Sequence, residues 1–246
     1  MEKEEKVSKR RNLHLKYSVN PKGFENWIQE RIDIHDGYRI LELGCSTGAL
    51  WYEHKDRIKN GTKLYLTDFS ENILDCCKKS FEKRDDIILD KVDIQNIPYE
   101  DKSFDIVIAN MMLYHVRNIN QALKEVRRVL KADGKFYCTT YGEHGTSEFL
   151  AKVLMSLGVD NNLNKRFTLQ NGLETLKEYF SNIKQEKYED SLAITNVDDF
   201  VDYIYTFSTM TNLQPEDYFE VKRILEARQV DGVLKVPKEY GMFICC

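Results

Sequence analysis

The sequence predicts an α/β protein with a doubly wound, mostly parallel sheet. Three short β-forming runs support this prediction, because each one ends in a glycine or a polar residue. The runs and their terminal residues are 40–43 followed by Gly44, 63–68 ending in Asp68, and 104–110 ending in Asn110. The carboxyl ends of parallel strands meet at one edge, which is where open α/β sheets bind ligands. We therefore expect these three residues to lie near a binding site.

The first run leads into a glycine-containing turn at residues 44–48. Ile40 to Leu43 is a compact apolar run of strand length, and the turn has glycine at both ends. Glycine permits a sharp bend and lets backbone N–H groups approach a ligand closely. We expect residues 49–59 to form the first crossover helix, ended by Gly61. A strand-to-helix turn that binds no ligand is the alternative.

The second run, Lys63 to Asp68, alternates apolar residues and closes on an acid. Asp68 follows Gly44 at close to the separation of about 20 residues at which nucleotide-binding folds place a carboxylate on ribose hydroxyls. A helix is expected from Ser70 to Lys83. Because Asp and Ser both cap helices well, Asp68 also fits the role of a cap for this helix.

The third and fourth strands supply two more polar residues at the same edge. We expect the third strand to close at Asp93 and the fourth to end at Asn110. A turn residue is the alternative interpretation of Asp93. The pattern then predicts a helix over 119–130 and a fifth strand over 135–141.

Five segments of the chain resemble one known family in order and spacing. They are Leu-Glu42-Leu-Gly44-Cys-Ser-Thr-Gly48, Leu-Thr-Asp68-Phe-Ser70, Val-Asp93-Ile-Gln-Asn-Ile-Pro98, Ser-Phe104-Asp105-Ile-Val-Ile-Ala-Asn110 and Glu125-Val-Arg-Arg-Val-Leu-Lys-Ala-Asp-Gly134. This set, from about Tyr38 to Tyr141, resembles the class I S-adenosylmethionine (SAM)-dependent methyltransferases, and is most similar to the group of small-molecule enzymes related to the ubiquinone/menaquinone C-methylases. The resemblance implies a Rossmann-like sheet of seven strands with a helical lid or cap. Ser46 stands where the family usually has glycine, which puts the cofactor affinity in question.

The resemblance also implies a binding site for SAM, with S-adenosylhomocysteine (SAH) as the product. In this family Asp68 would bind the ribose hydroxyls, Asp93 the adenine amino group, and backbone groups near Asn110 the cofactor's ammonium. Ile94 would pack on or beside the adenine ring. The implied cofactor-binding residues are Tyr17 from the lid and Glu42, Gly44, Cys45, Ser46, Gly48, Asp68, Phe69, Asp93, Ile94 and Asn110.

His115 is the candidate catalytic residue. It follows the fourth strand, where the resemblance places the meeting point of cofactor and acceptor. An imidazole titrates near neutral pH and so suits a general base. A packed, hydrogen-bonded histidine is the alternative.

We expect a single domain over residues 1–246. Within it, residues 1–35 form the lid, 36–145 the cofactor-binding core, and 146–246 an acceptor-side cap with the last two strands. In the first part, residues 1–11 are charged and expected to be frayed. In the last part, helices are expected near 148–157, 173–180, 197–207 and 215–227. The sixth strand is expected at 183–192, and a hairpin over 232–245 has Met242 to Cys245 as its last strand.

Composition narrows the class of partner. The 246 residues include 36 basic and 40 acidic side chains, giving a net charge of −4. Proteins that bind nucleic acid through counterion release carry clustered positive charge, so this balance argues against a nucleic-acid partner. No run is long and apolar enough for a membrane span and no signal peptide is visible, so we expect a cytoplasmic protein. The six cysteines show no metal-binding spacing, so we expect reduced thiols and no metal.

Three functions remain open on the sequence alone. The first is methyl transfer to an O, N or C atom of a small-molecule acceptor by in-line displacement, by a monomer or a homodimer. The second is methyl transfer to a macromolecule, for example an acyl group bound to a carrier protein. The third is a SAM-binding protein without catalysis, which the departure at Ser46 weakly favours.

Overall fold

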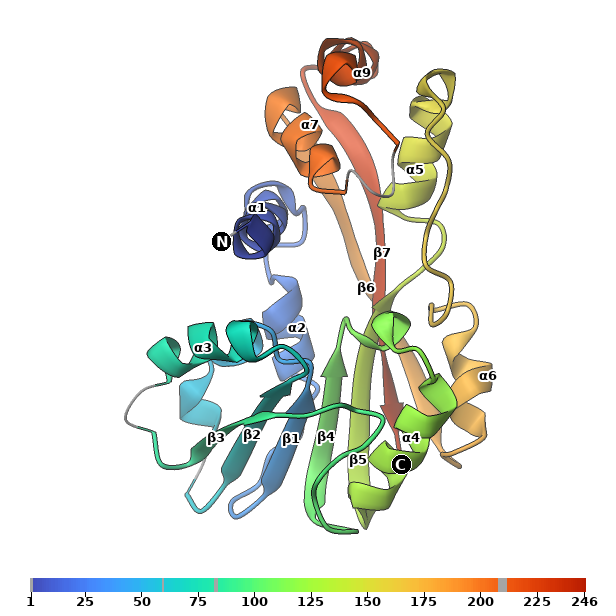
Figure 1. The fold of residues 1–246 in the computed structure, drawn as a ribbon. Coiled ribbons are helices and arrows are strands. Elements are labelled where there is room, and N and C mark those ends of the chain that lie inside the picture. Colours follow the sequence, from blue (N-terminus) through green and yellow to red (C-terminus); the bar gives the residue numbers. More distant parts are fainter. Residues whose placement is uncertain (1, 59, 82–83, 208–211) are drawn as a thin grey trace. The chain divides into compact units, whose positions relative to one another are not determined.

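The computed structural model describes residues 2–58, 60–81, 84–207 and 212–246 and contains one seven-stranded sheet (Figure 1). The strand order is β3-β2-β1-β4-β5-β7-β6. The strands are β1 (Arg39–Leu43), β2 (Lys63–Asp68), β3 (Ile87–Lys91), β4 (Phe104–Asn110), β5 (Leu130–Tyr141), β6 (Ile183–Ile194) and β7 (Leu234–Cys245). The first five strands pair in parallel. The predicted fold class is confirmed.

The chain divides into two compact units. The first comprises residues 1–23, 142–165 and 188–240, and the second comprises residues 24–141, 166–187 and 241–246. Each unit has its own cluster of buried apolar side chains. We describe the two units separately. The proposed division into lid, core and cap at residues 35 and 145 stays a prediction.

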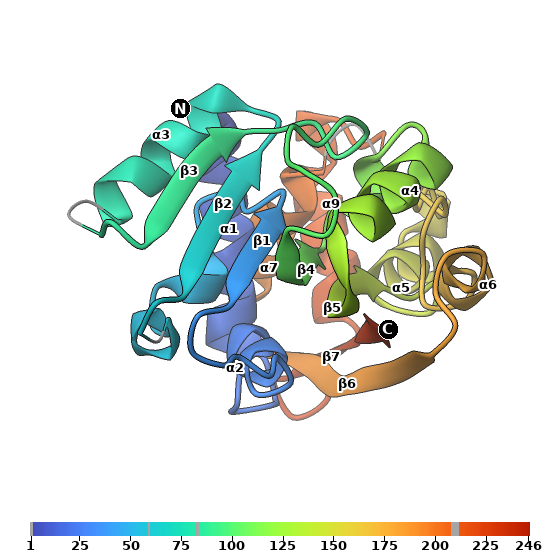
Figure 2. The same cartoon turned by 90° about the horizontal axis from the view of Figure 1, so that it is seen from below.

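The second unit contains the first five strands with their helices, α2 (Phe24–Gln29), α3 (Glu71–Ser80), α4 (Ile119–Val129) and α6 (Gly172–Lys177). Helix α3 contacts β2 and β3, and α4 contacts β5. In Figure 1 α4 lies beside β5, and Figure 2 shows the same sheet from below. In the strand register Leu43 lies opposite Thr67 on one side and Ala109 on the other. The carboxyl ends of β1, β2 and β4 therefore meet at one edge of the sheet.

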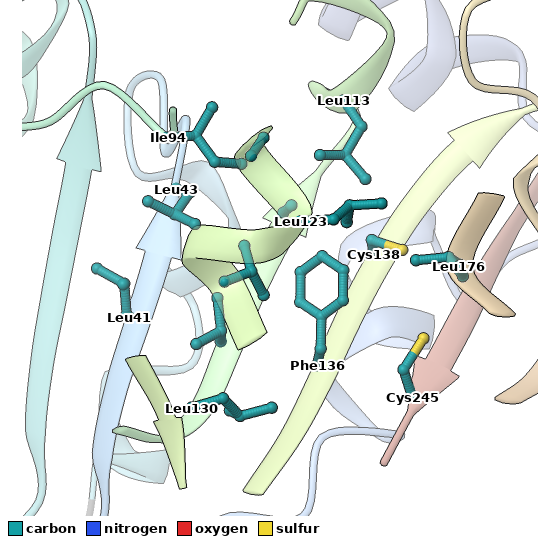
Figure 3. Packing of buried hydrophobic residues seen from close by; sticks show 14 of the residues in the cluster. Leu41, Leu43, Ile94, Leu113, Leu123, Leu130, Phe136, Cys138, Leu176 and Cys245 are labelled. Atoms are coloured by element: carbon teal, nitrogen blue, oxygen red, sulfur yellow. The ribbon is translucent and has the colours of Figure 1, made fainter. Parts of the chain in front are cut away.

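The core of the second unit fixes that edge. Leu41 and Leu43 of β1 pack with Leu123 of α4 and with Phe136 and Cys138 of β5 (Figure 3). All five side chains are nearly or fully buried. Parallel strands are typically covered on both faces, which explains why these runs are almost continuously apolar.

The first unit contains α1 (Glu2–Tyr17), α5 (Thr146–Val153), α7 (Val197–Tyr205) and α9 (Tyr218–Glu226). Its apolar cluster includes Leu13 and Tyr17 of α1 together with Phe200 and Ile204 of α7. A buried ion pair joins β7 to β6, in which Lys238 Nζ lies 2.5 Å from Asp190 Oδ2. Ser18 Oγ also donates to Asp190. Among the described residues, no helix has the length and apolar character needed to cross a bilayer.

Several predicted elements were right within a few residues. The strands over 63–68 and 104–110 and the helix near 119–130 are examples. The N-terminal stretch, expected to be frayed, is instead the start of helix α1. The third strand ends at Lys91, two residues before Asp93, which lies in a turn closed by a bond from Asn96 N to Asp93 O (2.9 Å).

The predicted crossover helix over 49–59 was wrong in its described part. Two 3-10 turns replace it, η1 (Ala49–Trp51) and η2 (Lys55–Arg57), and Lys59 lies outside the described residues. Hydrogen bonds to distant residues hold this segment, instead of the hydrogen bonds of an α-helix. Arg57 donates through Nη2 to Ile32 O (2.6 Å) and through Nη1 to Gln29 Oε1 (2.9 Å). Such tertiary contacts override local helix propensity.

The predicted hairpin over 232–245 was also wrong. Val230 and Val233 form a tight bridged turn, after which β7 runs without interruption from Leu234 to Cys245. The expected hairpin had Met242 to Cys245 as a separate last strand. Gly241 instead permits a close backbone approach, because a Cβ there would lie 2.5 Å from Glu186 O.

Candidate functional site

The turn after β1 has a backbone that favours glycine at three positions. Gly44, Ser46 and Gly48 all have positive φ, at 71°, 52° and 79°. A Cβ on Gly44 would lie 3.0 Å from Cγ of Met112, and one on Gly48 would lie 2.5 Å from the Phe81 ring. Ser46 is therefore a non-glycine residue held in the left-handed region, which costs free energy for an L-amino acid. The glycine turn predicted from the sequence is present and tightly packed.

Glu42, at the end of β1, is buried next to this turn. Its Oε2 accepts a 2.6 Å hydrogen bond from Trp51 Nε1, and its main-chain oxygen accepts one from Thr67 Oγ1 at 2.8 Å. Burial raises the pKa of Glu42 to about 7, against the lowering effect of the Trp51 bond. The nearby Asp68 charge raises this pKa further. Glu42 is thus a carboxyl group that changes its charge near neutral pH.

Asp68 links the glycine turn to the start of α3. Its Oδ2 accepts from Ser46 N at 3.1 Å, and its Oδ1 accepts from Ser70 N at 2.9 Å. The N-cap of α3 is Ser70, so Asp68 is not the N-cap residue. The next residue, Phe69, leaves 70% of its surface exposed. An exposed aromatic ring beside a carboxylate at a sheet edge suits the stacking of a planar group.

Asp93 is held within its own turn. Its Oδ1 accepts from Gln95 N at 2.9 Å and from Gln95 Nε2 at 3.2 Å. The structure thus shows the turn-residue interpretation of Asp93, and the same carboxylate stands just beyond the carboxyl end of β3. Ile94 is buried in the core cluster, beside Leu43 and Leu113 in Figure 3. Its side chain packs on protein.

The end of β4 is held by β5. Asn110 pairs with Thr139 in the strand register. Thr139 Oγ1 donates to Asn110 Oδ1 (2.6 Å) and accepts from Met111 N (2.9 Å). Met111 has a positive φ of 50°, and Met112 then lies against Gly44. The ends of β1 and β4 are therefore in direct packing contact.

Cys45 is a buried thiol and not a nucleophile. Its main-chain N donates to Thr67 O at 2.8 Å, which pairs the turn with β2. A hydrogen bond with Cys77, burial and the nearby Glu42 all raise the pKa of Cys45. Reactive cysteines have a lowered pKa in electropositive surroundings, so this one stays protonated.

The other two predicted site residues are Tyr17 and His115. Tyr17 belongs to the first unit, where its side chain is buried and its hydroxyl donates to Asp199 Oδ2 at 2.5 Å. His115 ends η3 (Leu113–His115), just after β4, and is exposed. Its ring centroid lies 4.5 Å from that of Tyr114. The structure thus joins Ser46 to Asp68 directly, and joins Gly44 to the segment after Asn110 through Met112.

Sequence reasoning missed three residues of the site. Trp51 donates to Glu42, a bond that the sequence does not predict. Met112 and Thr139 had no predicted role. The available signal for Thr139 was a pair of threonines in an otherwise apolar strand. That Thr139 lies opposite Asn110 follows only from the pairing of β4 with β5.

Comparisons with known proteins agree with this geometry. A family model described as a methyltransferase domain matches residues 41–138. A demethylmenaquinone methyltransferase of Lactobacillus johnsonii is 32% identical over 116 residues, which cover 46% of this chain and 48% of that protein. The chain spans about half the length of the curated relatives it matches.

Solved structures show the same fold. The YcgJ protein of Bacillus subtilis has a TM-score of 0.61 at 15% identity, covering 89% of this chain and 94% of that one. An N-methyltransferase of Haemonchus contortus, solved with phosphomonomethylethanolamine and SAH, has a TM-score of 0.56 at 19% identity. It covers 90% of this chain and 51% of that one.

The match to a methyltransferase domain over residues 41–138 covers the glycine turn and the carboxyl ends of β1, β2 and β4.

Proposed function

We propose that this chain moves a methyl group from SAM to an O, N or C atom of a small-molecule acceptor, leaving SAH. One observation carries the proposal. The carboxyl ends of three parallel strands meet at the glycine turn that follows β1, because Asp68 of β2 accepts from Ser46 N and Met112, just after β4, packs on Gly44. Such convergence at the carboxyl edge is where open α/β sheets bind ligands.

The residues present fit the cofactor that the family uses. The left-handed glycine turn is tightly packed, because a Cβ would lie 3.0 Å from Met112 at Gly44 and 2.5 Å from Phe81 at Gly48. In this proposal Asp68 accepts from the ribose hydroxyls, Phe69 offers an exposed face to the adenine, and Asp93 accepts from its amino group. Glu42 and the segment after Asn110 face the methionine end.

Ile94 takes a structural part in the proposal. Its side chain is 6% exposed, so it supports the adenine side of the site from the core. Tyr17 as a cofactor contact remains a prediction, as does the lid formed by residues 1–35.

Alignment is the main task of the protein in this reaction. SAM supplies an activated methyl group on a sulfonium, and the protein contributes binding, orientation and electrostatics. Orientation of reacting groups is worth roughly 7–11 kcal/mol of the barrier. His115, exposed next to the end of β4, is the proposed general base for acceptors that must lose a proton before attack.

The proposed acceptor is a small molecule. The relatives include demethylmenaquinone methyltransferases and a sterol 4-C-methyltransferase of Caenorhabditis elegans. The net charge of −4 argues against an RNA acceptor. A cytoplasmic location and a monomer or homodimer belong to the same proposal.

Transfer of a labelled methyl group into a cell extract tests the proposal. The protein is incubated with methyl-tritiated SAM and extract, and small molecules are separated from protein and RNA by ultrafiltration. We expect label in the small-molecule fraction beyond that of SAM itself. Label only in the macromolecular fraction would show a macromolecular acceptor, and SAM binding without transfer would show a non-catalytic protein.

The matched control is an acid at the other end of β3. Asp93→Asn should abolish most transfer, whereas Asp86→Asn should not. Asp86 lies at the amino end of the strand, where it pairs with Arg84 at 2.6 Å.

A further inference from the structure

We propose that Thr139 is a positioning residue for cofactor binding, because its hydroxyl holds the end of β4 in a binding-competent conformation. The inference rests on the proposed function. Thr139 lies on β5 and is 1% exposed, so it has no direct access to solvent. A hydroxyl buried in a sheet core is costly unless it is hydrogen-bonded. Here it forms two hydrogen bonds, and both go to the segment that ends β4.

The Thr139 hydroxyl acts as a donor in one of these bonds and as an acceptor in the other. A hydroxyl has one proton to donate and lone pairs to accept. Thr139 Oγ1 donates to Asn110 Oδ1 at 2.6 Å and accepts from Met111 N at 2.9 Å. The first bond fixes the direction of the Asn110 amide. The second holds Met111, which has a φ of 50° that a long side chain rarely adopts.

The Thr139 hydroxyl also affects the glycine turn, because the segment that it holds includes Met112, which packs on Gly44. Directly after Met111, Met112 has its Cγ 3.0 Å from the position that a Cβ on Gly44 would take. The chain then continues into η3, where His115 N donates to Met112 O at 2.9 Å. One buried hydroxyl therefore sets the geometry of the ends of both β1 and β4.

Loss of the hydroxyl should leave the protein folded. Met111 N also donates to the main-chain oxygen of Thr139 at 3.2 Å, so the strand pairing survives in Thr139→Val. Valine has nearly the same shape as threonine, so no cavity forms. The substitution removes the hydrogen bond to Asn110 Oδ1 and the shorter of the two hydrogen bonds from Met111 N.

The next residue on the same strand provides a matched control. Thr140 is fully buried, and its hydroxyl donates to Phe167 O at 2.8 Å. Successive residues of a strand point to opposite faces. Thr140→Val therefore removes a comparable buried hydroxyl bond without touching Asn110 or Met111. Thr139→Ser keeps the hydroxyl and serves as the rescue variant.

The test is SAH affinity by isothermal titration calorimetry, with melting temperature measured on the same samples. We expect Thr139→Val to weaken binding by about 10- to 100-fold, the range that corresponds to one or two lost hydrogen bonds. Thr139→Ser and Thr140→Val should stay within about threefold of wild type. The two valine variants should lose similar amounts of thermal stability.

Several outcomes would overturn the proposal. Unchanged affinity in Thr139→Val, or an equal loss in Thr140→Val, would reduce Thr139 to an ordinary core residue while leaving the cofactor site intact. If Thr139→Val does not fold, Thr139→Ala replaces it in the same comparison. A wild type that does not bind SAH would instead refute the proposed function itself.

Discussion

At the scale of single residues, Ser46 has a backbone conformation that its residue type disfavours. It occupies a left-handed position between two glycines and donates its N–H to Asp68. A non-glycine residue in this region costs about 1–2 kcal/mol. Glycine at the same place loses about 0.5–1 kcal/mol more through the flexibility of the unfolded chain.

Ser46→Gly should therefore raise the free energy of unfolding by about 0.5–1 kcal/mol, as measured by urea denaturation. It should also strengthen SAH binding, because removal of the side chain lets a ligand approach the turn. Lys102→Gly is the control, since Lys102 has the same left-handed backbone (φ 53°) far along the chain. It should gain stability without a change in affinity. A loss of stability in Ser46→Gly would contradict this account of the turn.

Glu42 makes a prediction about pH. Its pKa is raised by burial from 4.5 to about 7 in the folded protein. Between these values the folded state keeps the proton that the unfolded state has lost, so this group lowers the stability as pH rises. Glu42→Gln removes the titration and still accepts from Trp51.

The stability difference between Glu42→Gln and wild type should shift in favour of the variant by up to about 3 kcal/mol from about pH 5 to about pH 8. Denaturation at several pH values measures it, and the subtraction cancels the titrating groups that do not interact with Glu42. A difference that does not change with pH would show that Glu42 has an ordinary pKa.

The loop between β3 and β4 illustrates how elements position the site. Arg128 of α4 donates to Ile97 O and Tyr99 O at 2.8 Å each, and Glu125 accepts from Ile97 N at 2.9 Å. The bonds between Arg128 and Glu125 raise the pKa of Arg128 and lower that of Glu125. One helix thus holds the loop that carries Asp93.

Arg128→Ala should lower the free energy of unfolding by about 2–3 kcal/mol, because two carbonyls and the carboxylates of Glu125 and Asp101 lose a charged donor. Amide hydrogen exchange at residues 94–97 should accelerate. Arg127→Ala is the control, since Arg127 makes only a long 3.5 Å bond to Lys131 O among those identified, and it should change stability by less than about 0.5 kcal/mol. Unchanged exchange in Arg128→Ala would show that the loop does not depend on this side chain.

The elements also show where sequence reasoning succeeds. β2 and β4 matched their predicted bounds because alternating or continuous apolar runs flanked by polar residues give an unambiguous local signal. The segment over 49–58 failed because long-range bonds of Trp51 and Arg57, invisible in local pattern, decide its form. Thr139 was missed for the same reason, since its partners lie on another strand.

At the scale of the whole molecule, the matched methyltransferase domain and the second unit overlap. The domain match covers residues 41–138, and every strand end of the proposed cofactor site lies in that range. The first unit has a separate core and its own buried ion pair between Lys238 and Asp190. That residues 146–246 form an acceptor-side cap remains a proposal.

Calorimetric titration of SAH into wild type, Asp68→Asn and Asp86→Asn tests the central claim most directly. Asp68 bonds to the glycine turn, whereas Asp86 pairs with Arg84 at the opposite edge of the sheet. We predict that wild type and Asp86→Asn bind SAH alike and that Asp68→Asn binds about 10- to 100-fold more weakly. Equal binding by all three proteins would contradict a cofactor site at Asp68, and no binding by wild type would contradict the assignment of this edge as a SAM site.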